Sequence, residues 1–228
     1  MAAKTDSPIY LITDGAVLRK SGKLLHTIAV ALESAAGKVG FVQIREQVFG
    51  SNSIASDREL LDLSKEIYTI CFHCNAKCII NSRIDIALKL KLNGLNVGVH
   101  LGKHSSTITD ARSTLGDDAI IGYSAHSKKE ALNTLEAPLD KKADYVFLSP
   151  IFLPLSKQSS QPPLGISVLG SLCAESNSMV FALGGITTKN AMDCKKAGAS
   201  GIATISTIMH AKDPKIAIKE LIHSWNGH

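Results

Sequence analysis

The 228-residue sequence has no uninterrupted run of about 18 apolar residues, the length that a helix needs to cross a bilayer. Its first residues lack the charged start, apolar stretch and cleavage site of a secretory signal. Its five cysteines are an odd number, which does not fit a framework of paired disulfides. These absences predict a cytoplasmic protein that does not interact with a membrane.

Dense basic runs are also missing. Lys and Arg number 25 against 20 Asp and Glu, which gives a formal net charge of +5, but the basic residues are spread over the whole chain. A nucleic-acid-binding protein would instead concentrate them in an arm or a patch. We therefore expect anionic metabolites as partners and no nucleic acid.

Three of the cysteines lie close together, at Cys71, Cys74 and Cys78. Such a cluster could hold a metal or carry redox chemistry. Cys71 and Cys74, however, fall at the end of a helical pattern, whereas Cys78 enters a strand. We therefore expect buried or bystander thiols, since free cysteine commonly packs as a small apolar residue.

Apolar segments alternate with helical patterns along the whole chain. The apolar segments are nearly continuous, as parallel strands covered on both faces are, and an apolar content of 45% suffices for one sizeable core. Eight such units predict one α/β domain over residues 1–228, a single (β/α)8 or TIM barrel. The expected strands are Ile9–Thr13, Gly40–Arg45, Lys77–Asn81, Asn96–His100, Ala119–Ser124, Tyr145–Ser149, Met179–Leu183 and Gly201–Ile205. The expected helices are Leu24–Gly37, Asp57–Cys74, Ile84–Leu92, Ile108–Leu115, Lys128–Glu136, Ser167–Glu175, Lys189–Ala197 and Pro214–Trp225.

The last two strands end in small residues. Gly184 and Gly185 follow one strand, and Ser206 and Thr207 follow the other. Glycines let the backbone approach a ligand, and N–H groups at the following loops and helix starts can bind an anion, as in the phosphate sites of TIM barrels. This pattern predicts a phosphate-binding cup, with the alternative that Ser206 and Thr207 only cap a helix.

Two connections after strands are unusually long, at 47–56 and 150–163. Both would lie at the carboxyl end of the barrel, where such folds carry out their chemistry. We interpret them as candidate lids, in which Ser156 and Lys157 could close over a phosphate, or as tolerated surface insertions.

Polar residues follow several other strands. Gln43 and Arg45 are two residues apart and share one face of their strand, so both can point to the barrel centre. A buried Arg suits an anion there, although it could instead pair with a carboxylate such as that of Glu46. Three further strands end in a polar residue or have one just beyond the end, at Asn81, His100, and Ser124 with His126. His100 could equally be a satisfied strand-end histidine, and His126 could simply start a helix.

These residues carry a resemblance that covers almost the full chain in the same order. The motifs are Tyr10-Leu11-Ile12-Thr13-Asp14, Gln43-Ile44-Arg45-Glu46, Asn81-Ser82-Arg83-Ile84-Asp85, Val99-His100-Leu101-Gly102, Gly122-Tyr123-Ser124-Ala125-His126-Ser127, Ser149-Pro150-Ile151-Phe152, Gly184-Gly185-Ile186-Thr187 and Gly198-Ala199-Ser200-Gly201. In these motifs the chain resembles the thiamin phosphate synthase and TenI superfamily.

In the synthases, the resemblance implies that hydroxymethylpyrimidine pyrophosphate is joined to thiazole phosphate and that Mg²⁺ steadies the departing pyrophosphate. The family places one Asp directly after the strand-three Asn and a second in a Gly-Gln-Glu-Asp turn. Here Ser82 follows Asn81, and the turn reads Gly102-Lys103-His104-Ser105. Because Mg²⁺ prefers carboxylate oxygens, we expect no preformed metal site, with Asp85 as an alternative ligand and Lys103 as a partial replacement for the metal's charge.

The TenI branch, which contains the thiazole tautomerases, also lacks the two Asp residues. The resemblance implies that it shifts a double bond in a thiazole carboxylate phosphate, with a proton carrier and without a metal. His126 matches the histidine assigned to that proton transfer, and imidazole titrates in a suitable range. We therefore favour tautomerase-like chemistry on a thiazole phosphate, with His126, Gln43 and Asn81 facing the ring and no cofactor.

Several alternatives stay open. The first is the synthase, with pyrimidine pyrophosphate as second substrate and with Mg²⁺. The second is a non-catalytic regulator that keeps the cup, and the third is another phosphate-binding barrel isomerase. A homo-oligomer also stays open.

Overall fold

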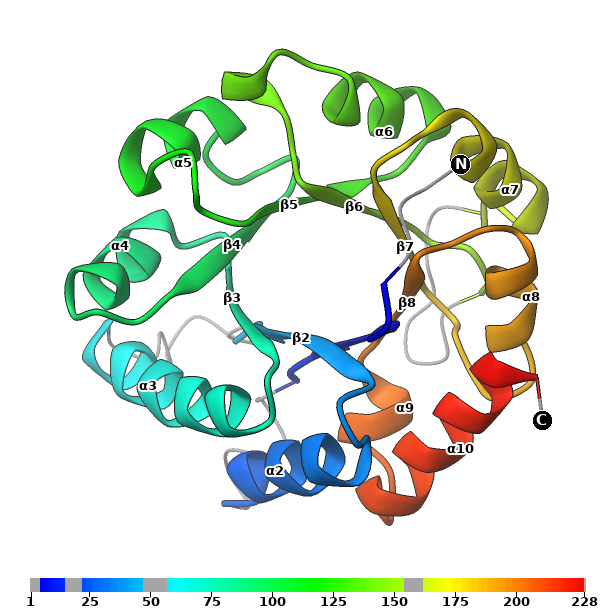
Figure 1. Ribbon diagram of the computed structural model, residues 1–228, viewed down its shortest axis with the longest axis horizontal. Coiled ribbons are helices and arrows are strands. Elements are labelled where there is room, and N and C mark those ends of the chain that lie inside the picture. The colour runs from blue at the N-terminus through cyan, green and yellow to red at the C-terminus, as the bar shows by residue number, and fades with distance from the viewer. Residues whose placement is uncertain (1–4, 15–21, 47–56, 154–161, 228) are drawn as a thin grey trace.

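Eight parallel strands close into a barrel in the order of the chain, from β1 next to β2 round to β8 next to β1. The computed structural model describes residues 5–14, 22–46, 57–153 and 162–227. In Figure 1 the strands form the inner ring and the helices lie around it. The strands are β1 (Ile9–Ile12), β2 (Val39–Ile44), β3 (Lys77–Asn81), β4 (Val97–Leu101), β5 (Ile121–Ala125), β6 (Tyr145–Leu148), β7 (Met179–Leu183) and β8 (Gly201–Thr204). The predicted TIM barrel is thereby confirmed, and no strand boundary is displaced by more than two residues.

The helices cover the outside of the barrel. They are α2 (Leu24–Ser34), α3 (Asp57–His73), α4 (Ile84–Leu92), α5 (Ile108–Leu115), α6 (Lys128–Leu135), α7 (Ile166–Glu175), α8 (Ala191–Lys196), α9 (Ser206–Met209) and α10 (Pro214–Asn226), with a 3₁₀ turn η1 (Leu139–Lys141). The sequence pattern did not predict α9 and η1, because elements this short show no periodicity. Within the described ranges, no helix is long and apolar enough to cross a bilayer.

Aromatic residues make up only 5% of the chain, yet several of them lie together inside the barrel. Tyr10, Phe41, Tyr145, Phe147 and Phe181 form one buried cluster there. The Tyr10 and Phe147 rings meet edge to face with centroids 4.7 Å apart, one of the favoured geometries of aromatic pairs. A second, larger apolar layer lies between the strands and the helices. The barrel is therefore a packed core whose free space lies at its ends.

One glycine makes room for this interior packing. Gly122 in β5 faces the barrel interior, and a Cβ placed on it would overlap the ring and hydroxyl group of Tyr145. Any other residue at this position would displace the tyrosine. The glycine therefore determines where the Tyr145 hydroxyl lies.

The clustered cysteines have a structural explanation. All five cysteines are free, and Cys71 and Cys78 are buried, with Cys74 partly buried. A hydrogen bond with Cys78, together with burial, raises the pKa of the Cys71 thiol. A raised pKa disfavours the reactive thiolate, in agreement with the expected bystander thiols.

Candidate functional site

The carboxyl ends of β2 and β3 bring Gln43 and Asn81 together. Gln43 Nε2 donates a hydrogen bond of 2.7 Å to Asn81 Oδ1. Gln43 is only 2% exposed, and among the described residues its Oε1 has no hydrogen-bond partner. Buried polar atoms are nearly always paired in native proteins. The unpaired oxygen is therefore an acceptor suited to a donor group of a ligand.

Arg45 follows directly after β2 and is half-buried. Its backbone N–H donates to Thr13 Oγ1 at 2.9 Å, which ties the end of β2 to that of β1. Burial lowers the pKa of the guanidinium, and the nearby Asp14 carboxylate opposes this shift. Glu46, the partner considered from the sequence, accepts from the Thr13 hydroxyl at 3.2 Å. A partly desolvated cation at this position favours an anionic ligand.

His126 lies one residue beyond β5 and is held by three contacts, the longest being between its Nδ1 and Ser149 Oγ at 3.5 Å. Its Nδ1 is 3.0 Å from the carbonyl oxygen of Ser149, and its backbone N–H donates to Glu130 Oε2 at 2.8 Å. A carbonyl oxygen can only accept, so Nδ1 carries the hydrogen and Nε2 keeps a lone pair in the neutral ring. The exposed imidazole can therefore accept a proton at Nε2. The helix α6 begins two residues later with Ser127 as its N-cap, so His126 itself does not start it.

Gly184 and Gly185 adopt φ values of 97° and 65°, in the left-handed region that favours glycine. A Cβ on Gly184 would lie 2.8 Å from Pro150 Cα, and one on Gly185 would lie 2.8 Å from Phe152 Cβ. Phe152 N also donates to Gly184 O at 3.0 Å. These glycines thus admit the segment that follows β6. Their role in binding phosphate remains a prediction.

Ser206 and Thr207 form the first turn of α9, which has four residues. Thr207 Oγ1 donates to the Ile186 carbonyl at 2.8 Å, so the hydroxyl joins the ends of β7 and β8. Its oxygen lone pairs remain available to a donor. Ser156, Lys157 and the connection 47–56 lie outside the described residues.

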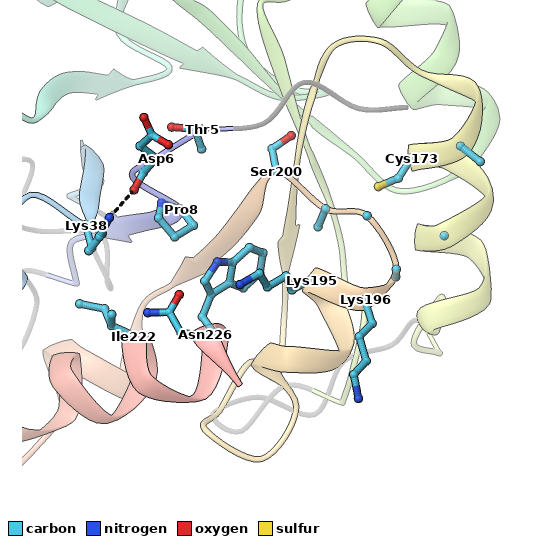
Figure 2. A pocket seen from close by; sticks show the side chains of 16 residues that line it. Thr5, Asp6, Pro8, Lys38, Cys173, Lys195, Lys196, Ser200, Ile222 and Asn226 are labelled. Carbon is cyan, nitrogen blue, oxygen red and sulfur yellow. Dashed lines mark hydrogen bonds between the residues drawn. The ribbon is translucent and has the colours of Figure 1, made fainter. Parts of the chain in front are cut away.

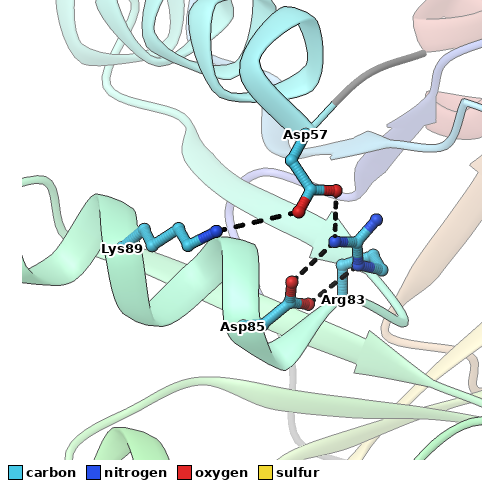
Figure 3. Close-up of polar contacts among 4 residues, drawn as sticks. All are labelled: Asp57, Arg83, Asp85 and Lys89. Atoms are coloured by element: carbon cyan, nitrogen blue, oxygen red, sulfur yellow. Dashed lines mark hydrogen bonds and ion pairs between the residues drawn. The ribbon is translucent and has the colours of Figure 1, made fainter.

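The acidic residues near the third strand do not fit a magnesium site. Asp85 receives two hydrogen bonds from Arg83, of 2.8 and 2.6 Å, and Arg83 also donates to Asp57 at 2.7 Å (Figure 3). Hydrogen bonding to Arg83 lowers the pKa of Asp85. Ser82, which follows the strand-three Asn81, offers a hydroxyl in place of a carboxylate. Within the ranges that the structure describes, no three His, Cys, Asp or Glu side chains form a metal-binding group.

His100 is more deeply buried than its place near a strand end suggested. It is 3% exposed, and its ring nitrogens contact Ser124 Oγ at 2.8 Å and Tyr145 Oη at 3.1 Å. Burial lowers the pKa of His100 to about 3. The expected satisfied histidine is therefore observed. The sequence did not reveal its tyrosine partner, because the contact depends on the barrel register.

A cavity of about 640 Å³ lies at the opposite, amino-terminal face. Pro8, Lys38 and Ser200, which precede β1, β2 and β8, contribute to its lining (Figure 2). The Lys38 ammonium donates to the backbone oxygen of Asp6 at 3.2 Å, and Lys196 points away from the hollow. This cavity is separate from the polar residues at the carboxyl ends of the strands.

Together, the closed parallel barrel and the polar residues at its carboxyl end define a TIM-barrel protein with a site in the position typical of enzymes of this fold. Residues 9–208 match the model of the thiamine monophosphate synthase family, and the chain belongs to that family.

Named relatives and solved structures agree with this assignment. The chain is 34% identical over 221 residues to a protein of Syntrophomonas wolfei named thiamine-phosphate synthase, covering 97% of both chains. It is 34% identical over 201 residues to a protein of that name from Chlorobium phaeobacteroides, covering 88% of this chain and 91% of the relative. The structure of thiamine phosphate pyrophosphorylase from Pyrococcus furiosus aligns with a TM-score of 0.78 at 27% identity, covering 96% of each chain. The predicted superfamily is confirmed, and these names favour the synthase alternative over the preferred tautomerase reading.

Proposed function

We propose that the protein is a thiamine-phosphate synthase. In this reaction the bond between the pyrimidine methylene carbon and pyrophosphate breaks, pyrophosphate leaves with the electron pair, and the thiazole nitrogen forms a bond to the same carbon. The observation that carries the proposal is the similarity over nearly the full length to proteins named for this activity. The substrates would be hydroxymethylpyrimidine pyrophosphate and thiazole phosphate.

The described site residues can be assigned to parts of these substrates. The unpaired, buried Gln43 Oε1 suits the amino group of the pyrimidine, and Asn81 holds the Gln43 amide in that orientation. Arg45 suits a phosphate oxygen, because its guanidinium is partly desolvated. For the thiazole phosphate we propose Gly184, Gly185, Ser206 and Thr207. Ser156 and Lys157 are proposed as further contacts to the anionic groups of either substrate.

A divalent ion, where bound, supplies charge that steadies pyrophosphate. The two described acidic residues near the end of β3, Asp85 and Asp57, are both engaged by Arg83, so they do not offer a free carboxylate pair that would hold it. We therefore assign the leaving group's charge in this chain to Arg45 and Lys157. On this proposal turnover persists when divalent ions are chelated.

The test supplies the purified full-length protein with both substrates and measures thiamine phosphate and pyrophosphate, with Mg²⁺ and with a chelator. Formation of the two products in equal amounts supports the synthase. Arg45→Met should remove most turnover, whereas Lys219→Met, which removes a positive charge from the exposed face of α10, should retain it. Absence of thiamine phosphate under every condition would overturn the proposal.

The geometry of His126 favours a second candidate, thiazole tautomerase activity. Its Nδ1 is bound to the Ser149 carbonyl, which leaves Nε2 free to move a proton on a ring. Incubation with the non-aromatic thiazole carboxylate phosphate distinguishes the two activities. Aromatisation that is lost in His126→Gln supports the tautomerase. If the ligands bind but neither reaction occurs, the non-catalytic regulator is favoured.

A further inference from the structure

A chain of hydrogen bonds crosses the barrel interior from β1 to the rim of the candidate site. Tyr10 Oη is 2.6 Å from Tyr145 Oη, which is 3.1 Å from His100 Nδ1. On its other side, His100 Nε2 is 2.8 Å from Ser124 Oγ. We name these four residues the Tyr-His-Ser chain. The first three are buried, whereas Ser124 is half-buried in the second-last position of β5.

The surroundings of the chain are aromatic. The Phe147 ring stacks on His100 with centroids 4.2 Å apart, and Phe41 stacks on Tyr10 with centroids 5.1 Å apart. In this apolar environment the pKa of His100 falls to about 3, so the imidazole is neutral near neutral pH. A neutral imidazole donates from one nitrogen and accepts at the other. The chain must therefore run in one direction through the ring.

Only one donor-to-acceptor direction along the Tyr-His-Ser chain gives every buried hydroxyl and imidazole hydrogen an acceptor. If Tyr10 donates to Tyr145, and Tyr145 donates to His100 Nδ1, then His100 donates from Nε2 to Ser124. In the reverse direction Tyr10 would be the last donor, and among the described residues its hydroxyl contacts only that of Tyr145. A hydroxyl hydrogen would then stay unpaired in the aromatic interior, an arrangement that native proteins avoid.

We propose that His100 and Tyr145 are positioning residues that hold Ser124 as a hydrogen-bond donor toward the substrate. Since Ser124 Oγ already accepts from His100, its own hydrogen is free to point to the mouth of the barrel. The acceptor would be an oxygen of phosphate or pyrophosphate, and this part of the inference rests on the proposed function. Gly122 supports the arrangement, because its missing side chain provides the space for the Tyr145 hydroxyl.

The direction of the chain can be measured without any substrate. Long-range proton–nitrogen NMR of the ¹⁵N-labelled full-length protein distinguishes the two imidazole tautomers, and loss of one signal in His100→Gln assigns it. We expect the hydrogen of His100 on Nε2 at neutral pH. A hydrogen on Nδ1, or on both nitrogens, would overturn the inference. Since wild-type protein is observed, the result does not depend on how a variant folds.

The positioning role predicts a dependence between two substitutions. With inorganic pyrophosphate as the calorimetric probe, Ser124→Ala and His100→Leu should each weaken binding on the order of tenfold, the effect of losing a hydrogen bond to a charged acceptor. The double variant should bind no more weakly than Ser124→Ala alone. His100→Gln, whose amide can donate to Ser124, should restore most of the affinity.

Tyr68→Phe is the matched control, because it removes a hydroxyl outside the barrel, where Tyr68 Oη contacts the Asn96 N–H. Circular dichroism verifies that each variant is folded. If the loss of pyrophosphate affinity in the double variant equals the product of the losses in the two single variants, the positioning role is contradicted. If the expected tautomer and the expected affinity of the double variant are found but no thiamine phosphate forms, the proposed function is refuted. The inference about the Tyr-His-Ser chain is then retained. If thiamine phosphate forms but the His100 hydrogen lies on Nδ1, the inference about the Tyr-His-Ser chain is refuted and the proposed function is retained.

Discussion

Acid should destabilise the folded protein through His100. The pKa of this buried imidazole is about 3, compared with 6.5 for an exposed histidine. Below pH 6.5 the unfolded chain therefore takes up a proton that the folded chain does not. The stability that the neutral ring contributes is present above the unfolded pKa and is lost progressively as the pH falls toward the folded pKa. Between pH 7 and pH 5 this linkage amounts to about 2 kcal/mol in the free energy of unfolding.

Urea unfolding, followed by circular dichroism at both pH values, measures this loss. His100→Gln removes the titrating group and keeps a polar side chain, while His104→Gln removes an exposed histidine as the matched control. Wild type and His104→Gln should each lose about 2 kcal/mol more than His100→Gln on going from pH 7 to pH 5. An equal loss in all three proteins would refute the reasoning, because His100 would then titrate alike in the folded and unfolded chains.

Two further predictions concern stability and can be checked by chemical unfolding. Asp213 caps α10 by accepting hydrogen bonds from two backbone N–H groups, so Asp213→Ala should lower the free energy of unfolding by about 1 kcal/mol. Asp213→Asn, which keeps an acceptor oxygen, should restore most of it, and equal values for both variants would contradict the cap. Gly122→Ala should lower the free energy by roughly 1–3 kcal/mol, because the added methyl group overlaps Tyr145. Gly170→Ala, inside α7 and with its nearest atoms at 3.8 Å, should instead raise it by about 0.5–1 kcal/mol. A stable Gly122→Ala would show that the ring can move.

The strands could be predicted because each is a run of apolar residues covered on both faces, a local signal. The spacing of two predicted that Gln43 and Arg45 share one face of their strand and can point to the barrel centre. The structure shows Gln43 buried near the end of β2, and Arg45 follows directly after this strand. By contrast, the partners of His100 depend on how β4 aligns with its neighbours. His100 lies opposite Gly122, and Gly122 lies opposite Tyr145. No local pattern encodes that alignment.

The glycines after β7 show a different limit. Their small size was expected to serve a ligand, whereas the structure shows the backbone of 150–153 packed against them. A Gly-Gly pair signals a close approach but does not say which group approaches. The contacts of Ser206 and Thr207 could not be predicted for a similar reason, because α9 is too short to show a period.

The backbone at Ser82 has a consequence for how this site could change. Ser82 has a φ of 60°, a conformation that Asp and Asn adopt more readily than most residues, because their short polar side chains bond locally. An acidic residue introduced there would meet less strain from the main chain than most other side chains would. The loop is thus already shaped to present a carboxylate beside Asn81, and acquiring a ligand for a divalent ion would require a new side chain but no new loop.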